Sequence, residues 1–141
     1  MPNTQHTVAN RLLWTAQVLA ALVFLFAGSA KFFLPPAQLQ GPIPLPLGFI
    51  YFIGVCEVAG ALGLILPGVT GIRPSLTPLA ALGLLIIMIG ATVITATGMG
   101  VIPALFPLVV GIIVATIAWG RWRAVPLRAR RRRSLASRTV A

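Results

Sequence analysis

Four apolar runs, each about as long as a membrane is thick, limit what this chain can fold into. A helix needs about 20 apolar residues to cross a hydrocarbon core about 30 Å thick. The runs cover residues 12–33, 47–66, 78–97 and 101–119, and the formal charges inside them are Lys31 and Glu57. A water-soluble helix would instead carry a charged face along its length. The pattern therefore predicts four transmembrane helices.

The composition agrees with lipid as the main solvent. Apolar residues make up 58% of the 141 residues and charged residues only 9%, whereas a soluble domain carries about 25% charged residues. Such a chain has too little polar surface to coat a soluble globule. The expected fold is all-α, a four-transmembrane-helix antiparallel bundle, with an N-terminal tail over residues 1–11 and a basic C-terminal tail over residues 120–141.

Proline and glycine mark the connections between the runs. The segment PPAQLQGPIPLP holds five prolines in twelve residues, which favours an extended loop over a continuing helix. We expect the second helix to stop at Pro67-Gly68 and the third to begin at Thr77-Pro78, a capping residue followed by proline. Only residues 98–100 separate the third and fourth runs, which predicts a tight antiparallel hairpin.

The distribution of arginine predicts the orientation. With four crossings, both termini and the loop between the second and third runs share one side of the membrane. The ten arginines on that side are Arg11, Arg73, Arg121, Arg123, Arg128, Arg130, Arg131, Arg132, Arg133 and Arg138. Because cytoplasmic segments carry an excess of basic residues, we expect a multi-pass protein of the bacterial plasma membrane with both termini in the cytoplasm.

The small residues AGSA at positions 27–30 allow a second interpretation of the first run. A cation, an apolar stretch and small residues also form the pattern of a secretory signal peptide with its cleavage site. The stretch from Leu12 to Ala27 is slightly longer than the usual core of about 7–15 residues, and it continues past Lys31. We therefore favour retention of the first helix; the intact mass of the purified protein decides between the two.

Small residues predict where the helices touch, because membrane helices associate through close packing and interhelical polar contacts. Each helix has one side rich in small residues, and on the first helix Gln17 shares that side with Lys31. The glycines expected to serve helix packing are Gly28, Gly54, Gly60, Gly83, Gly90 and Gly111.

Lys31 and Glu57 are the residues most informative about function. An ionisable group near the middle of a membrane costs about 2.5–3.5 kcal/mol on insertion scales, so it should face the bundle and find a partner. Side chains lean toward the N-terminus of their own helix. In antiparallel helices the two side chains therefore lean toward each other. Either they form an internal ion pair that fixes the packing, or Glu57 belongs to a pocket that binds protons or a polar ligand.

The remaining chemistry-bearing residues exclude several classes of site. Cys56 is the only cysteine and His6 the only histidine, so the chain holds no cysteine pair and no four-ligand metal site. We expect no metal, no cofactor of its own and no catalytic activity. A single acid, without a second titratable relay group, also argues against a stand-alone proton pump.

The arginines near the C-terminus raise the question of nucleic acid, but four adjacent membrane spans favour lipid. Basic residues beside a span attract anionic headgroups, each contributing about 1 kcal/mol. The arginines expected to contact headgroups are Arg121, Arg123, Arg128, Arg130, Arg131, Arg132 and Arg133. The expected partners are thus the lipid bilayer and anionic headgroups, and no nucleic acid.

Several stretches together resemble the DoxX-like family of small bacterial membrane proteins. They are FLFAGSAKFF with Lys31, GVCEVAGALGLILP with Glu57, TGIRPSLTPLAALGLLIIMIGA, and the fourth run with its internal proline. The resemblance spans about residues 12–119. It implies a four-helix membrane fold, and the family's name derives from a subunit of an archaeal thiosulfate:quinone oxidoreductase.

Two functional hypotheses follow from the resemblance and from the intramembrane charges. The first is a non-catalytic membrane subunit or accessory of a redox or respiratory system, near the quinone pool and beside a membrane oxidoreductase partner. The second is a small transporter or ligand-binding membrane protein that uses the Glu57 pocket. Four short helices are too few to surround a wide pathway, so transport would require a homo-oligomer.

Overall fold

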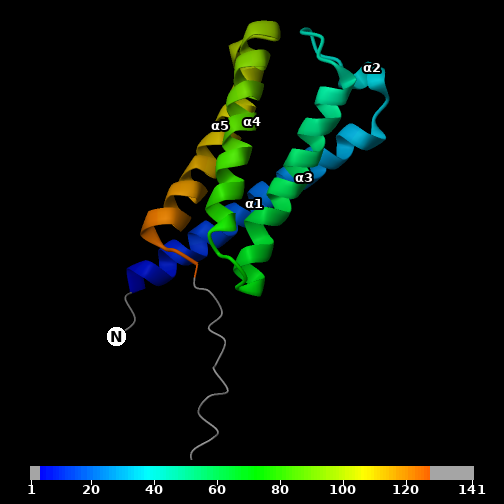
Figure 1. Ribbon diagram of the computed structural model, residues 1–141. Coiled ribbons are helices and arrows are strands. Elements are labelled where there is room, and N and C mark those ends of the chain that lie inside the picture. The colour runs from blue at the N-terminus through cyan, green and yellow to red at the C-terminus, as the bar shows by residue number, and fades with distance from the viewer. Residues whose placement is uncertain (1–3, 128–141) are drawn as a thin grey trace, which may run out of the picture.

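The structure, a computed structural model, describes residues 4–127 and is helical throughout its regular parts (Figure 1). The elements are α1 (Thr4–Phe33), a short α2 (Pro36–Leu39), α3 (Leu47–Thr70), α4 (Leu76–Gly98), α5 (Val101–Trp119) and a π-helical segment η1 (Gly120–Ala124) that continues α5. Four helices are long and apolar enough to cross a membrane. The predicted fold class is confirmed.

The four long helices run antiparallel in chain order, so the bundle has two distinct ends (Figure 1). The end where α1 begins, α3 meets α4 and α5 finishes is called the terminal end. The opposite end, with α2 and the connection between α4 and α5, is called the hairpin end. Glu57 lies between the two, and Lys31 lies toward the hairpin end.

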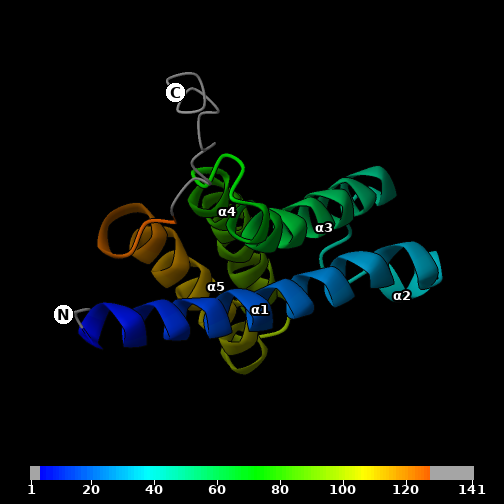
Figure 2. The ribbon, with the colours of Figure 1, turned by 90° about the horizontal axis from the view of Figure 1, so that it is seen from below.

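Packing proceeds through neighbouring pairs: α1 lies against α3, α3 against α4, and α4 against α5. Viewed from below, α1 also crosses α5 obliquely, which brings the first and last helices together (Figure 2). The side chains buried where the four helices meet include Phe24, Leu64, Leu84, Val114 and Ile117. Toward the hairpin end α3 and α4 separate from each other (Figure 1).

The outer surface is as apolar as the interior. Phe26 is 79% exposed and Ile102 is 82% exposed, and similar side chains surround the bundle. A soluble monomer rarely leaves such continuous apolar surface in water. Lipid is the solvent that covers it without cost.

Several helix ends differ from the sequence-based expectation. α1 begins at Thr4, so the segment expected as a tail is helical from that residue on. α3 continues through Pro67 and ends at Thr70. The next residue, Gly71, caps the helix with a φ of 68°, the left-handed conformation that glycine adopts most readily. Pro67 removes one helix donor and its ring crowds the carbonyl four residues earlier, yet the helix continues to Thr70. α4 begins at Leu76, before the expected Thr77-Pro78.

Candidate functional site

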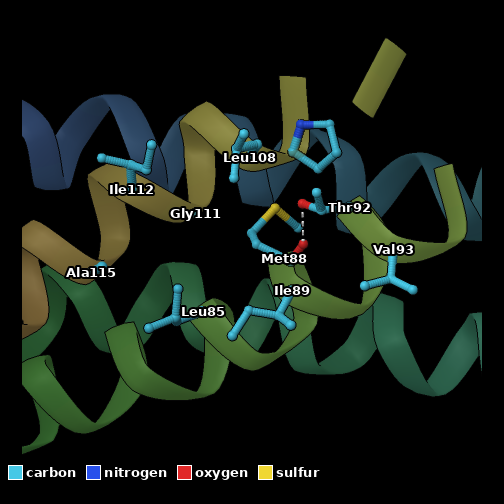
Figure 3. Close-up of a pocket in the computed structure, with 10 residues that line it drawn as sticks. Leu85, Met88, Ile89, Thr92, Val93, Leu108, Gly111, Ile112 and Ala115 are labelled. Carbon is cyan, nitrogen blue, oxygen red and sulfur yellow. Dashed lines mark hydrogen bonds between the residues drawn. The ribbon is translucent and has the colours of Figure 1, made fainter. Parts of the chain in front are cut away.

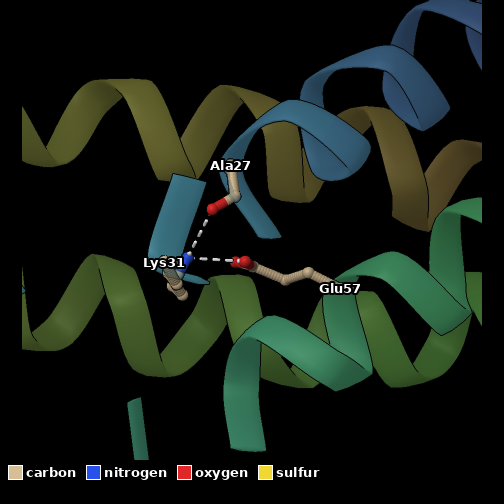
Figure 4. A network of polar contacts seen from close by, with 3 residues as sticks. All are labelled: Ala27, Lys31 and Glu57. Atoms are coloured by element: carbon tan, nitrogen blue, oxygen red, sulfur yellow. Dashed lines mark hydrogen bonds and ion pairs between the residues drawn. The ribbon is translucent and has the colours of Figure 1, made fainter. Parts of the chain in front are cut away.

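Lys31 on α1 and Glu57 on α3 meet inside the bundle (Figure 4). The Lys31 ammonium donates a hydrogen bond to Glu57 Oε2 at 2.5 Å and a longer one to the Ala27 carbonyl at 3.3 Å. The Glu57 side chain is 5% exposed, and that of Lys31 is 22% exposed. Side chains tilt toward the N-terminus of their own helix. Because α1 and α3 are antiparallel, the two side chains tilt toward each other.

Two glycines allow the helix backbones to approach at this pair. A Cβ atom at Gly28 would lie 2.9 Å from the Gly54 carbonyl oxygen, and one at Gly54 would lie 3.1 Å from the Gly28 carbonyl oxygen. Any other residue would push α1 and α3 apart. The ion pair is therefore held by close backbone contact in addition to its own attraction.

The ion pair lines a cavity at the hairpin end, called here the pair cavity, with a volume of about 580 Å³. Its walls come from the halves of α3 and α4 that separate from each other, and include Phe52, Ile86 and Ile94. Apart from the ion pair and Thr95, its lining side chains are apolar. The charged pair thus forms the polar end of an otherwise apolar cavity.

The connection between α2 and α3 covers the pair cavity at the hairpin end. Its residues Pro42 and Ile43 line the cavity, and both lie 3.3 Å from the position that a Cβ atom would take at Gly98, the last residue of α4. Gln40 holds the loop together, because its side chain donates to the Leu45 carbonyl and accepts from the Leu45 amide. The proline-rich segment thus packs as a cover on the helices.

The chain was compared with known protein families and with known proteins. The model of the DoxX-like family matches residues 15–117. This chain belongs to the DoxX-like family. No curated protein and no solved structure matches it. The matched range contains Lys31, Glu57 and the whole pair cavity, so the family's shared region includes the site.

The glycines of this DoxX-like protein divide into two groups. At Gly60 an added Cβ would lie 2.6 Å from Leu84, and at Gly111 it would lie 3.3 Å from Met88, so both positions serve helix contact. At Gly83 and Gly90 no atom of the described residues outside the local helix backbone lies within 4 Å of an added Cβ. The face of α4 expected from its glycines is therefore not the packed one. The buried residues of α4 are Thr77, Pro78, Ala81, Leu84 and Met88.

A second polar cluster, which the sequence analysis missed, lies at the terminal end. Arg121 in η1 is 3% exposed, although the sequence placed it among the headgroup-contacting arginines. Its Nε donates to Gln17 Oε1 at 2.5 Å and its Nη1 donates to Asn10 Oδ1 at 2.7 Å. The guanidinium carbon also lies 5.4 Å from the centre of the Trp14 ring. These four residues are called the arginine cluster.

Gln17 ties three helices together in this cluster. Its side chain is fully buried, and while its oxygen accepts from Arg121, its nitrogen donates to the Leu64 carbonyl of α3 at 2.6 Å. Two features of the sequence indicate this cluster. Gln17 shares a helix face with Lys31, and Arg121 falls three residues after the buried Ala118, on the same side of a continued helix.

The other predicted headgroup contacts divide by position. Arg123 is exposed at the terminal end, as are Trp119 and Trp122. Arg128, Arg130, Arg131, Arg132 and Arg133 lie outside the residues that the structure describes. Contact of these arginines with lipid stays a prediction.

A smaller cavity of about 250 Å³ lies between α4 and α5 (Figure 3). Its one hydroxyl, on Thr92, donates to the Met88 carbonyl of its own helix at 2.7 Å. The other lining side chains are apolar. This cavity therefore offers no polar group to orient a ligand, in contrast to the pair cavity.

Proposed function

We propose that this DoxX-like protein is a membrane-embedded binding protein whose pair cavity takes a small molecule with an apolar body and a polar group. The observation that carries the proposal is the placement of the Lys31–Glu57 pair in the wall of an apolar cavity. Ligand pockets typically combine apolar walls with a few polar groups that fix orientation. Ionisable residues within membrane spans are expensive and often mark binding sites.

The pair retains hydrogen-bonding capacity that its contacts within the bundle do not use. An ammonium carries three donors, and contacts with the described residues use two of those of Lys31. Glu57 Oε1 accepts no hydrogen bond from the described residues, whereas Oε2 accepts from Lys31. One donor and one acceptor are therefore available to a molecule in the cavity.

The orientation expected from arginine places this cavity in the outer half of the membrane. Arg11, Arg73 and Arg123 are exposed at the terminal end, together with Trp119 and Trp122. Basic residues favour the cytoplasmic side. We therefore place the terminal end in the cytoplasm. The accessory role beside a membrane oxidoreductase rests on the family resemblance and stays a prediction.

Native mass spectrometry of the protein released from mild detergent tests the binding role. The wild type should retain a bound small molecule, visible as a reproducible mass increment. The double variant Lys31→Met/Glu57→Gln removes both charges and keeps side chains of similar size, so it should retain the fold and lose the increment. An identical increment in the double variant would overturn the proposal.

Gly48→Leu is the matched control for nonspecific effects of substitution. Gly48 lies in the first turn of α3, nothing lies within 4 Å of its added Cβ, and it does not line the pair cavity. This variant should keep both the fold and the bound molecule.

A further inference from the structure

A second cavity of about 590 Å³ continues the pair cavity along α3 and α4. The two share the lining residues Cys56, Ile86 and Ile87. The lining side chains of the second cavity are otherwise apolar or glycine. Together the two form one space, called here the furrow, that starts at the ion pair and follows the helices toward the terminal end.

The furrow is long enough for an extended chain. On α3 its lining runs from Phe49 to Pro67, which is about 27 Å at a rise of 1.5 Å per residue. The hydrocarbon core of a bilayer is about 30 Å thick. From Glu57 to Pro67 the furrow extends about 15 Å beyond the polar pair. A compact ligand would leave this part empty.

The furrow is open toward lipid rather than toward water. Its lining residues Phe52, Ile86 and Leu79 are 61%, 70% and 58% exposed on the apolar outer surface. At the hairpin end the loop with Pro42 and Ile43 covers the pair cavity. A molecule dissolved in the bilayer can therefore enter sideways between α3 and α4.

The charge of the site selects the head of the ligand. Lys31 and Glu57 cancel each other, so a charged head would leave a net charge in an apolar space, which is costly. The available donor on Lys31 and the available acceptor on Glu57 instead match a neutral head that carries both an acceptor and a hydroxyl.

We infer that the ligand is a neutral single-chain amphiphile that enters from the bilayer, places its head at Lys31 and Glu57, and lays its chain along the furrow. The inference rests on the proposed function, since both use the ion pair. It adds the neutral head, the single long chain and the sideways entry, and the head and the chain each have their own test.

The probe is stearoylglycerol with a photoreactive diazirine near the end of its chain, added to the protein in lipid nanodiscs. Its head is neutral and has both a carbonyl and hydroxyls. After illumination, peptide mass spectrometry should find the label on the furrow side of α3 and α4, near Leu66 and Leu79. Excess unlabelled stearoylglycerol should suppress this label. Label spread evenly over the lipid-facing surface of α5 and insensitive to competition would overturn the inference.

Gly83→Leu tests the course of the chain. Gly83 lines the furrow and nothing lies within 4 Å of its added Cβ, so a leucine fits the helix and fills the furrow. Site-specific labelling should fall by roughly tenfold, while the melting temperature should not fall, because leucine is a better helix former than glycine. Gly48→Leu, the same substitution at an open glycine outside the furrow, should label like the wild type. Equal labelling of the Gly83 variant would overturn the furrow as the chain's path.

Two further experiments distinguish a failure of the neutral-head inference from a failure of the proposed function. Stearate with the same diazirine carries a charged head and should label the furrow at least roughly tenfold less; equal labelling would overturn the neutral head. Lys31→Met/Glu57→Gln should abolish labelling with stearoylglycerol. If that variant loses the label while Gly83→Leu keeps it, binding at the pair stands and the furrow fails. If the charge-free variant keeps the label, the proposed function itself fails.

Discussion

The ion pair and the arginine cluster both bury a cation in an apolar bundle, but they stabilise it differently. Lys31 is balanced by the only acid in the chain, Glu57, and the pair faces a cavity. Arg121 is surrounded by neutral groups, the amide oxygens of Gln17 and Asn10, the Val125 carbonyl and the Trp14 ring. The first arrangement presents polar groups to a cavity. The second joins helices through Arg121 Nε and Nη1, while Nη2 is buried without a hydrogen-bond partner among the described residues.

This difference assigns separate tasks to the two ends of the bundle. At the terminal end Gln17 links α1 to α3 and, through Arg121, to η1. At the hairpin end α3 and α4 separate (Figure 1). Side chains of both helices line the pair cavity in this region. A tight cluster at one end permits the other end to stay open without loss of the fold.

Removing one partner of the ion pair should have the largest effect. Breaking a buried pair costs about 3–5 kcal/mol, because the remaining charge is left without compensation. Lys31→Met should destabilise more than Glu57→Gln, since Glu57 is the more buried partner and Lys31 keeps its bond to the Ala27 carbonyl. The free energy of unfolding in mixed detergent micelles measures both effects.

The double variant Lys31→Met/Glu57→Gln serves as the control for this pair. It leaves no unpaired charge, so it should recover much of the stability lost by either single variant. Strictly additive losses would mean that the two side chains stabilise the protein independently.

The sequence predicts the contact between Lys31 and Glu57 because charges within apolar runs are conspicuous. The four apolar runs contain two charged residues, and these lie on adjacent antiparallel helices. Each charge therefore has few possible partners other than the opposite one. The pair cavity was not predictable in this way, since it arises where α3 and α4 separate, and that angle depends on contacts such as Gly60 against Leu84. The glycine pattern of α4 indicated a packed face, yet Gly83 and Gly90 face the furrow.

The arginine cluster was missed for a different reason. The apolar run stops at Trp119, so hydropathy alone predicts that Arg121 belongs to a basic tail. In the structure the chain continues as η1 for one more turn, and the Val125 amide bonds to the Gly120 carbonyl at 2.7 Å. Hydropathy marks the apolar part of a helix, but the polar residues just beyond it follow the same face when the helix continues.

Gln17→Leu should have the next largest effect. It tests whether the Gln17 side chain joins α1 to α3 and η1 at the terminal end. A hydrogen bond to a charged group contributes about 1.5–3 kcal/mol, and the variant leaves the buried Nε of Arg121 without its partner. Unfolding free energy should fall by about that amount. The control is Thr92→Val, which removes a hydroxyl bonded only within its own helix. Equal losses for the two variants would show that Gln17 does not join the helices.

Gly28→Ala tests whether the ion pair needs the close approach of α1 and α3. The added Cβ would lie 2.9 Å from both the Gly54 carbonyl oxygen and a Val58 methyl, so the helices must shift. Overpacking typically costs about 1–3 kcal/mol. Gly83→Ala is the opposite case, with an open position, and should stabilise α4 by about 0.5–1 kcal/mol. Melting temperatures of the two variants should therefore move in opposite directions, and a common direction would contradict the assigned contacts.

Trp14→Leu should have the smallest effect among the destabilising variants, and it shows how far an aromatic face substitutes for an acid. The Trp14 ring lies 5.4 Å from the Arg121 guanidinium, and a cation–π contact contributes about 0.5–1 kcal/mol when exposed and about 2 kcal/mol when desolvated. Trp14 also lies close to Gly68, so leucine removes both electrostatic and packing terms. Trp14→Phe keeps an aromatic face and should retain part of the stability that Trp14→Leu loses. If both variants lose the same free energy of unfolding, the ring contributes packing alone, and the amide oxygens of Gln17 and Asn10 are what hold the cation inside the bundle.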